Sequence, residues 1–359
     1  MSDAAFSAVK EAIRAAAAAQ QPVAIRGGGT KAFYGESVDG DILDTSSLAG
    51  IVAYEPTELV ITALAGTPLD TIETTMRTHG QLLGFEPPHF ARGGTLGGAI
   101  ASGLSGPRRP YAGAARDFVL GMRVIDGTGE ALNFGGRVMK NVAGFDVSRL
   151  MTGALGTLGV ITEVSLKCLP LPRAEATREI ECSAAESIRL VNAWGGRPLP
   201  LSASCWHAGR LSVRLSGAAP AIAAAVEAIG GSESAHGDAF WSSVRDHTHP
   251  FFAPALRDGH ALWRLSVRST APVESFGGAP PLIEWGGSLR WLVTAADADA
   301  APMRGWAAAH GGHATLFRGR KRGGAFAPRD ATILGLHRRL KATFDPHGIL
   351  NRGRLYPEF

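Results

Sequence analysis

The sequence is poor in cysteine and lacks a segment suited to cross a membrane. Its 359 residues include three cysteines, Cys168, Cys182 and Cys205, which are odd in number and far apart. Without a C-x-x-C pair, this set argues against a disulfide framework, a zinc site and an iron–sulfur cluster held by this chain alone. No run of about 18 apolar residues occurs, and Asp3 and Glu11 stand inside an Ala-rich helical pattern rather than a signal peptide. We therefore expect a cytoplasmic protein.

Long basic segments are also missing. The formal net charge is +4 at pH 7, and lysine and arginine are not interleaved with aromatic residues in any long stretch. This pattern argues against nucleic-acid binding. The basic cluster Arg318-Gly-Arg-Lys-Arg322 is interpreted as a solvated loop or a partner-facing patch.

Glycine, by contrast, is abundant, with 46 residues, and three of them follow one another after a short apolar run. Val23–Ile25 predicts a buried strand. Gly27–Gly29 then gives a backbone that can adopt positive φ and has no Cβ to keep a ligand away. Consecutive N–H groups in such a turn can converge on an oxyanion. Further donors stand beside the glycines, namely Arg26, Thr30 and Lys31. We interpret the segment as a pyrophosphate cradle.

The spacing of the glycines disfavours a Rossmann dinucleotide site. That fold places G-x-G-x-x-G directly at the start of a helix, whereas Lys31–Gly35 does not continue as an apolar-faced helix. Two further glycine clusters, Gly93–Gly103 and Gly153–Thr162, add backbone and hydroxyl donors and an apolar strand suited to an adenine pocket. Three such clusters are hard to explain by turns alone, so a purely structural glycine turn is the weaker alternative.

Periodicity predicts a chain that changes character after Leu169–Pro172, which is interpreted as a linker. Before it we expect helices at 3–20 and 68–79 and strands at 23–25, 41–43, 59–62, 118–124 and 160–166. After it we expect an α+β layer with an antiparallel sheet, containing strands at 211–215, 261–267 and 289–293 and helices at 218–229 and 301–310. A final helix is expected at about 329–344.

The order of the motifs resembles a known family. R-G-G-G-T-K, G-G-T-L-G-G-x-I-A-S-G, R-D-F-V-L-G, K-N-V-A-G-F-D and G-A-L-G-T-L-G-V-I-T follow one another as in the vanillyl-alcohol-oxidase-type (PCMH-type) FAD-binding domain, over about residues 20–170. Phe344–Arg354 resembles that family's C-terminal return to the flavin. Within the family, the short length and the segments Gly66–Leu69 and His79–Pro88 look most like the FAD-binding subunits of bacterial glycolate oxidases.

The resemblance implies an α+β protein in three parts. These are a PCMH-type FAD-binding domain of two α+β subdomains at 1–170, a smaller α+β cap on an antiparallel sheet at 171–330, and a C-terminal segment at 331–359 that returns to the FAD domain. The cap would serve the substrate or a partner.

The resemblance also carries over a set of FAD contacts. The pyrophosphate residues would be Arg26, Gly27, Gly28, Gly29, Thr30 and Lys31. Along the dinucleotide and flavin would lie Gly94, Thr95, Gly97, Gly98 and Ser102. Arg116 and Asp117 would position the following strand and loop. The adenosine side would be met by Gly156, Gly159, Val160 and Ile161, and the isoalloxazine by Asn351.

Three departures from the family pattern qualify this picture. Relatives that tether FAD through histidine place it just after the first glycines, where this chain has Thr30 and Lys31, so we expect non-covalent FAD. The H-x-G-D-G-N-x-H-type metal segment of relatives that oxidise D-2-hydroxy acids is not found in this sequence. Arg352 stands where the family usually has proline.

The implied function is oxidation of glycolate to glyoxylate, with electrons passing through FAD to partner subunits. The partners would be a second flavin subunit and an iron–sulfur subunit, through which the chain could lie at the inner face of the membrane. Two alternatives stay open: a stand-alone FAD-dependent dehydrogenase of another 2-hydroxy acid or alcohol, and a non-catalytic flavin-binding scaffold.

No residue is assigned as the catalytic base, and no metal is expected. His247 and His249 are interpreted as exposed loop histidines rather than a metal pair, and His310 and His313 as histidines that cap carbonyl groups at a helix end. His89 precedes the second glycine cluster and is either an ordinary loop histidine or a flavin neighbour. Two further flavin-neighbourhood candidates are Lys140 and Asp146. The seven tryptophans, all beyond residue 190, are expected to serve packing, with a subunit interface as the alternative.

Overall fold

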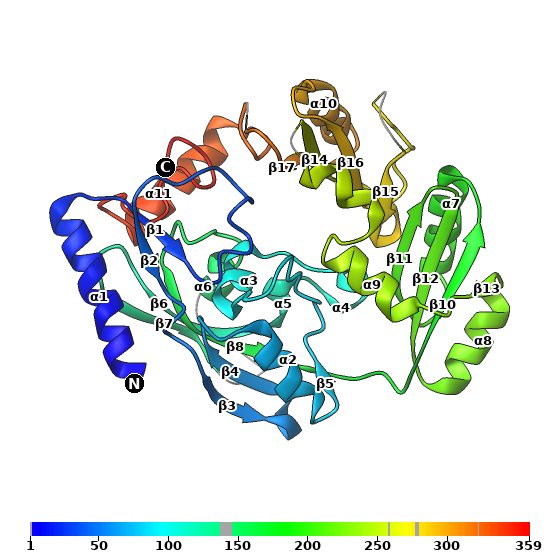
Figure 1. Ribbon diagram of the computed structural model, residues 1–359, viewed down its shortest axis with the longest axis horizontal. Helices are drawn as coiled ribbons and strands as arrows, with labels where there is room; N and C mark the ends of the chain where they lie inside the picture. Colours follow the sequence, from blue (N-terminus) through cyan, green and yellow to red (C-terminus); the bar gives the residue numbers. More distant parts are fainter. Residues whose placement is uncertain (1, 137–145, 258, 277–279, 322) are drawn as a thin grey trace. The chain divides into compact units, whose positions relative to one another are not determined.

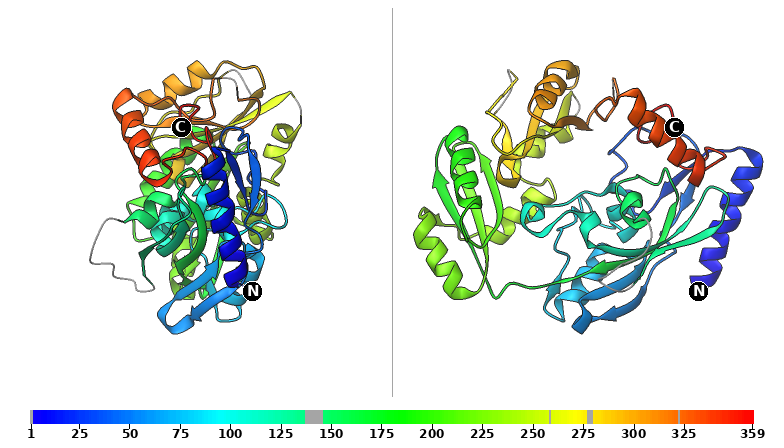
Figure 2. Two further views of the ribbon diagram at one scale, coloured as in Figure 1. Left: turned by 90° about the vertical axis from the view of Figure 1, so that its left-hand side faces the viewer. Right: turned by 180° about the vertical axis from the view of Figure 1, so that it is seen from behind.

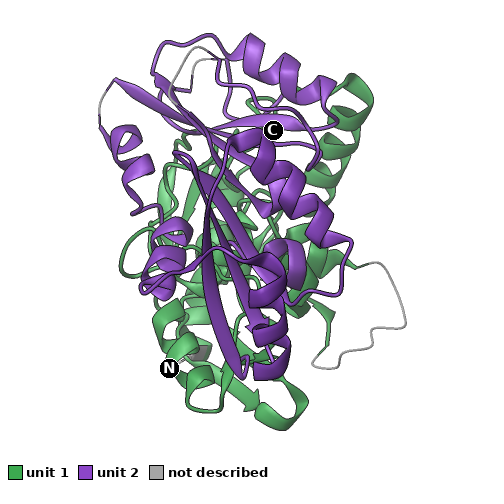
Figure 3. Ribbon diagram, turned by 90° about the vertical axis from the view of Figure 1, so that its right-hand side faces the viewer, with its two compact units in different colours: residues 1–104, 114–171, 328–359 green, residues 105–113, 172–327 purple. Residues whose placement is uncertain are grey.

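The structure is a computed structural model that describes residues 2–136, 146–257, 259–276, 280–321 and 323–359. The chain forms two compact units (Figure 3). Unit 1 comprises residues 1–104, 114–171 and 328–359, and unit 2 comprises residues 105–113 and 172–327. The chain therefore leaves unit 1 twice and returns to it at its C-terminal end.

Unit 1 consists of short strands separated by short helices (Figure 1). Its helices are α1 (Ser2–Ala19), η1 (Pro56–Glu58), α2 (Leu69–Arg77), α3 (Leu96–Ser102), α5 (Ala115–Phe118), α6 (Val147–Met151) and α11 (Ala331–Phe344). Its strands are β1 (Val23–Arg26), β2 (Asp41–Asp44), β3 (Ile51–Glu55), β4 (Val60–Leu64), β5 (Gln81–Leu82), β6 (Val119–Ile125), β7 (Ala131–Gly135), β8 (Val160–Lys167) and β9 (Leu169–Pro170).

A five-stranded antiparallel sheet forms one part of unit 1, in the order β3-β4-β8-β6-β7. Its central strands β4, β8 and β6 are almost continuously buried because both of their faces are covered. Thr62 and Ser165 are opposite each other in the sheet, and their buried hydroxyls lie 2.8 Å apart. The strands expected at 59–62, 118–124 and 160–166 are confirmed, each displaced or extended by one or two residues.

The parallel pair β1–β2 forms the second part, together with α1 and the C-terminal segment. Helix α1 turns Val9 and Ile13 inward at helical spacing, and these side chains join a core cluster with Val23 and Leu350. On the edge of β1 opposite β2, the Val23 amide donates to Ile349 O at 2.8 Å and Val23 O accepts from the Asn351 amide at 3.0 Å. The end of the chain thus extends the sheet begun near its start.

Unit 2 is built on an eight-stranded sheet of antiparallel pairs, in the order β13-β10-β12-β11-β15-β16-β14-β17. Its strands are β10 (Ala174–Glu181), β11 (Leu201–His207), β12 (Arg210–Gly217), β13 (Ser232–Glu233), β14 (His260–Ser266), β15 (Leu282–Glu284), β16 (Leu289–Ala295) and β17 (His313–Arg318). Its helices are α4 (Arg109–Ala112), α7 (Ala184–Gly195), α8 (Ala219–Ile229), α9 (Gly237–Arg245), η2 (Pro250–Leu256), η3 (Trp285–Gly287) and α10 (Ala300–Ala309).

Two clusters of apolar side chains hold the helices of unit 2 on its sheet. Helices α7 and α8 pack on the same face of β10, β11 and β12 (Figure 2), with Val191, Trp206 and Val213 in their shared core. Helix α10 packs on β14 and β17 through Met303 and Ala307. The expected antiparallel α+β layer is confirmed. None of the described helices combines the length and hydropathy that a membrane span requires.

Residues 105–113 join unit 2, although the sequence analysis placed them inside the 1–170 region. Trp285 explains the difference, because its Nε1 donates to Gly106 O at 3.1 Å and its ring lies 4.5 Å from the Arg109 guanidinium. Arg108 adds an ion pair with Glu175 at 2.8 Å. These partners are distant in sequence, so local pattern could not reveal them.

We predict that Ile13→Ala lowers the free energy of unfolding by about 2–5 kcal/mol. Ile13 is fully buried, with 0% exposure, so truncation removes buried apolar surface and leaves a cavity. Urea unfolding of both proteins measures the difference. The matched control is Ile333→Ala on α11, whose side chain is 37% exposed and should change stability by less than about 1 kcal/mol. Equal losses in the two variants would contradict the burial seen here.

Candidate functional site

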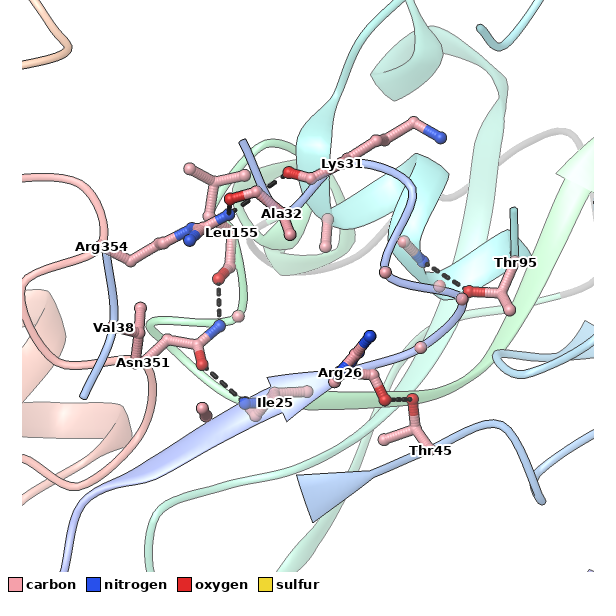
Figure 4. Close-up of a pocket in the computed structure, with 18 of the residues that line it drawn as sticks. Ile25, Arg26, Lys31, Ala32, Val38, Thr45, Thr95, Leu155, Asn351 and Arg354 are labelled. Carbon is pink, nitrogen blue, oxygen red and sulfur yellow. Dashed lines mark hydrogen bonds between the residues drawn. The ribbon is translucent and has the colours of Figure 1, made fainter. Parts of the chain in front are cut away.

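Unit 1 contains a cavity of about 590 Å³, within the range of about 300–1,000 Å³ usual for small-molecule sites. Four segments line it: β1 with its glycine loop and the chain up to Thr45, the first turn of α3, the turn before β8, and the C-terminal segment (Figure 4). The lining residues are Ala24, Ile25, Arg26, Gly27, Gly28, Gly29, Thr30, Lys31, Ala32, Ser37, Val38, Gly40, Ile42, Thr45, Thr95, Gly97, Gly98, Ala101, Leu155, Gly156, Gly159, Ile161, Asn351 and Arg354.

The glycine loop presents backbone donors at this cavity. Within the described part of the chain, the amides of Gly27–Thr30 donate to no protein acceptor. Gly29 has φ +69°, a conformation that favours glycine. A Cβ built on Gly29 would lie 3.0 Å from Arg26 Nε, so the guanidinium folds back over the loop. Consecutive amides beside a cation form an arrangement suited to a phosphate group.

The first two glycine clusters pack directly against each other. A Cβ on Gly28 would lie 1.6 Å from Gly93 O, and one on Gly27 would lie 2.5 Å from Thr95 Oγ1. Thr95 is the N-cap of α3 and accepts a hydrogen bond from the Gly98 amide at 3.3 Å. The glycines are therefore required by the close approach of two loops as well as by any ligand.

Two further cationic residues of the lining, Lys31 and Arg354, contact other protein groups. Lys31 Nζ lies 5.6 Å from the centroid of the Phe90 ring. Arg354 donates to Glu36 O at 2.7 Å and to Ala32 O at 3.0 Å, which ties the C-terminal segment to the chain that follows the glycine loop. Burial lowers the pKa of Arg354, and Glu36 opposes this shift. No anionic side chain lines the cavity among the described residues, so its field favours an anionic ligand.

Asn351 connects three walls of the cavity (Figure 4). Its Oδ1 accepts from the Ile25 amide at 2.7 Å, and its Nδ2 donates to Leu155 O at 2.6 Å. Both Asn351 and Leu155 have positive φ, of 41° and 53°, which is unusual for residues with a Cβ. The side-chain amide is therefore used to fix the walls, and its strained backbone is held by tertiary contacts.

Comparisons with known proteins agree with this geometry. Residues 6–135 match a family model described as an FAD binding domain. Over 352 residues, the chain is 46% identical to the glycolate oxidase subunit GlcE of Escherichia coli K12, covering 98% of this chain and 97% of that protein. The chain belongs to the family of GlcE. The resemblance to PCMH-type FAD-binding proteins is thereby confirmed, and this chain has an FAD-binding domain.

More distant relatives match less than half of this chain. The glycolate oxidase subunit GlcD of Bacillus subtilis is 31% identical over 159 residues, which cover 44% of this chain and 33% of that protein. A D-lactate dehydrogenase of Archaeoglobus fulgidus is 32% identical over 154 residues, covering 42% and 34%. A solved structure of alkyldihydroxyacetonephosphate synthase has a TM-score of 0.64 at 14% identity and covers 96% of this chain and 74% of that one, which shows the fold alone.

The lining fits FAD in its chemistry. The backbone amides of Gly27–Thr30 and the Arg26 guanidinium suit a pyrophosphate, while Ile25, Leu155 and Ile161 offer apolar walls for flat rings. Most of the residues that the sequence marks for FAD line the cavity: Arg26, Gly27, Gly28, Gly29, Thr30, Lys31, Thr95, Gly97, Gly98, Gly156, Gly159, Ile161 and Asn351. Their contact with FAD stays a prediction.

Five marked residues lie outside the lining. Val160 is fully buried in the core on the α1 side, because neighbouring residues of a strand face opposite ways. Ser102 donates to Ala99 O within α3, and Gly94 O accepts from the Leu69 amide. Arg116 and Asp117 belong to α5, where Asp117 Oδ2 accepts from the Ala114 amide.

Sequence reasoning missed other lining residues, chiefly the chain from Ser37 to Thr45 and Arg354. The parallel pairing of β2 with β1 brings the chain from Ser37 to Thr45 to the cavity. No local sequence motif predicts that pairing. Arg354 had a signal, since it ends the C-terminal motif that contains Asn351.

The histidine pair beyond the FAD-binding region differs from expectation. His247 is buried rather than exposed, because its ring stacks on Phe252 at 4.0 Å and contacts Trp291 at 4.6 Å. His249 is the N-cap of η2, where its Nδ1 accepts from the Phe251 amide. His310 lies at the end of α10 with Nδ1 2.8 Å from Trp306 O, as a capping role predicts.

Tryptophan packing is confirmed for the residues that are buried in unit 2, Trp194, Trp206, Trp241, Trp263, Trp285 and Trp291, while Trp306 packs at the edge of a core cluster. The basic cluster is not simply a solvated loop. Arg318 ends β17, and burial lowers its pKa to about 10, while Lys321 Nζ donates to Leu316 O at 2.9 Å. Arg322 lies outside the described residues.

Of the remaining flavin-neighbourhood candidates, His89 and Asp146 do not line the cavity. His89 lies between two carboxylates, with Nδ1 3.2 Å from Asp70 and Nε2 3.2 Å from Glu73. Asp146 is the N-cap of α6 and pairs with Arg149 at 2.9 Å. Lys140 lies outside the described residues. The described structure therefore gives no reason to assign His89 or Asp146 as a base.

We predict that Gly28→Ala weakens FAD binding by about 100-fold or more. The added Cβ would overlap Gly93 O, so the two loops must separate and the donor groups must move. Fluorescence titration of the apoprotein with FAD measures the effect. Gly335→Ala on α11 is the control, because its Cβ would meet nothing within 4 Å. Unchanged affinity in Gly28→Ala would contradict the loop packing.

We also predict that the protein loses stability as the pH falls below about 6.5. Burial, with Arg318 and Arg264 nearby, holds the pKa of His247 well below its ordinary value. The unfolded chain therefore binds a proton that the folded chain does not, and the free energy of unfolding falls by up to about 1.4 kcal/mol per pH unit for this group. Burial also lowers the pKa of His207 and His249, in the same direction.

Urea unfolding at pH 5, 6 and 7 measures this dependence. His247→Leu, which cannot titrate, should have a shallower dependence than the unmodified protein, whereas the exposed control His260→Gln should keep the full slope. Identical slopes in His247→Leu and the unmodified protein would contradict the burial of His247.

Proposed function

We propose that this chain is the FAD-binding subunit of a glycolate oxidase complex, an FAD-dependent oxidoreductase that acts on CH–OH groups. The observation that carries the proposal is the relation to GlcE along nearly the whole chain, together with a cavity whose donors and apolar walls suit FAD. Fold-level likeness by itself would not support an activity.

The chain's own residues would hold the cofactor without a covalent tether. The amides of Gly27–Thr30 and the Arg26 guanidinium would meet the pyrophosphate, and Ile161 and Leu155 would contact the rings. Thr30 and Lys31 stand where histidine-tethered relatives have their attachment residue, so no histidine is present there to form that bond. The bound cofactor is therefore expected to leave the protein when the fold is lost.

When bound, FAD supplies the two-electron oxidation of a CH–OH group to a carbonyl, here glycolate to glyoxylate. The described lining of the cavity offers cations, hydroxyls and amides but neither imidazole nor carboxylate. Among the described residues, the lining thus lacks the imidazole and carboxylate groups that most often take a hydroxyl proton. This favours an electron relay in this subunit, in which glycolate is oxidised at a partner and electrons then pass through this chain's FAD.

The partners in this proposal are a second flavin subunit related to GlcD and an iron–sulfur subunit. The first is suggested by the relation of part of this chain to GlcD of Bacillus subtilis. An iron–sulfur partner would supply the cluster that this chain, with cysteines buried or far apart, is not built to hold alone. The chain would work in the cytoplasm, and any place at the inner face of the membrane would come through these partners.

The test is anaerobic titration with glycolate, followed by the absorbance of the flavin. We expect the purified chain to be yellow yet slowly reduced by glycolate, and the co-expressed complex to be reduced rapidly. Oxidation of glycolate by the isolated chain at the full rate of the complex would overturn the subunit assignment. If glycolate does not reduce the flavin of the complex, the assignment of glycolate as the substrate is wrong.

Precipitation with acid tests the mode of attachment separately. We expect all of the flavin to appear as FAD in the supernatant, as for a non-covalent cofactor. Flavin retained in the protein pellet would contradict this expectation.

A further inference from the structure

Helix α11 buries a charge where an apolar residue would be expected. Lys341 is the residue of this helix that the structure buries, with 5% of its surface exposed, and Asp345 at the helix end is 1% exposed. Lys341 Nζ and Asp345 Oδ2 lie 2.6 Å apart. Burial lowers the pKa of Lys341, and the Asp345 carboxylate opposes that shift. Removing such a pair from water costs free energy. We therefore infer its role from the other groups that it contacts.

The Lys341 ammonium joins two separate segments of the chain. Besides Asp345, it donates to Thr157 O at 2.8 Å and to Leu350 O at 2.6 Å. An ammonium has three N–H donors, so all of them are used. Thr157 belongs to the turn before β8, and Leu350 belongs to the segment that runs beside β1.

The Asp345 carboxylate completes the arrangement. Its Oδ1 accepts from the Ile349 amide at 3.1 Å, and its Oδ2 accepts from the Leu350 amide at 2.8 Å. The backbone at 349–350 is thus held through two amides and one carbonyl by a single charged pair. Gly127 also packs closely against Asp345, since a Cβ on this glycine would lie 2.3 Å from Asp345 Oδ1.

These contacts lie immediately behind the cavity wall. Leu350 precedes Asn351, and Thr157 is next to Gly156, both of which line the cavity. In front of the pair, Asn351 Nδ2 donates to Leu155 O, so the two segments are joined on both sides of the wall. Neither Lys341 nor Asp345 lines the cavity itself.

We propose that Lys341 and Asp345 are positioning residues for the FAD site: they set the distance between the turn at 155–159 and Asn351, and thereby the affinity and environment of the flavin. The inference rests on the proposed function, since it assumes that FAD occupies this cavity. It assigns no contact with FAD to either residue.

The experiment compares the full-length protein with Lys341→Met/Asp345→Leu, Asp345→Asn and the control Arg338→Met. The double variant replaces the pair with apolar side chains and leaves no unpaired buried charge, so it keeps a packed core. Asp345→Asn keeps the side-chain shape and one acceptor. Arg338 is exposed on the same helix. The readouts are fluorescence titration of each apoprotein with FAD, the fine structure of the flavin absorption band, and amide hydrogen exchange at 155–159 and 349–351.

We expect the double variant to bind FAD about tenfold more weakly or worse, with an altered flavin band. Its amides at 155–159 and 349–351 should exchange faster even without FAD, while exchange elsewhere stays unchanged. Asp345→Asn leaves the Lys341 charge without its carboxylate and should weaken binding at least as much as the double variant, whereas Arg338→Met should match the unmodified protein.

Two results overturn the inference. One is a double variant with unmodified affinity and flavin band, and the other is loss of exchange protection throughout unit 1, which would make the pair a general stabiliser. Failure of the proposed function looks different, because the unmodified protein would then bind no FAD while the local exchange differences could still be measured.

Discussion

Val23 exchanges two backbone hydrogen bonds with Ile349 and Asn351, and this pairing of the chain's beginning with its end governs the rest of unit 1. It extends the short pair β1–β2 by a further segment and closes the core around α1. It also brings Asn351 to the side of Ile25, 326 positions away in the sequence. Two strands alone would be marginal in water, so the cavity depends on the return of the C-terminus.

A second constraint is the close approach of the two glycine loops. Gly28 and Gly93 leave no room for a Cβ between them, and Gly27 is similarly confined by Thr95. This packing fixes the glycine loop in a shape that leaves its amides without protein acceptors among the described residues. The same glycines therefore serve packing and presentation, because a backbone without side chains can come close to both a neighbouring loop and a ligand.

Buried polar groups in unit 1 are concentrated where segments distant in sequence meet. Asn351 donates to Leu155 O, while the Lys341–Asp345 pair binds backbone groups of Thr157 and Leu350. These hydrogen bonds join the two segments that form this wall of the cavity. Removing one member of a buried pair costs about 3–5 kcal/mol, since the other charge is left uncompensated. Apolar packing could hold these segments together equally well, but it would specify their separation less sharply than hydrogen bonds do.

The sequence by itself determined eight of the strands, the glycine loops and the family. Through the family resemblance it also marked just over half of the residues that line the cavity, because motifs such as Gly27–Thr30 are continuous in the chain. Tertiary structure alone decided the rest. Val160 packs in the core while Ile161 lines the cavity, and β1–β2 pairing brings Ser37–Thr45 to the site. Residues 105–113 belong to unit 2, and His247 is buried among aromatic rings. Each of these depends on a partner far along the chain, which short-range pattern does not encode.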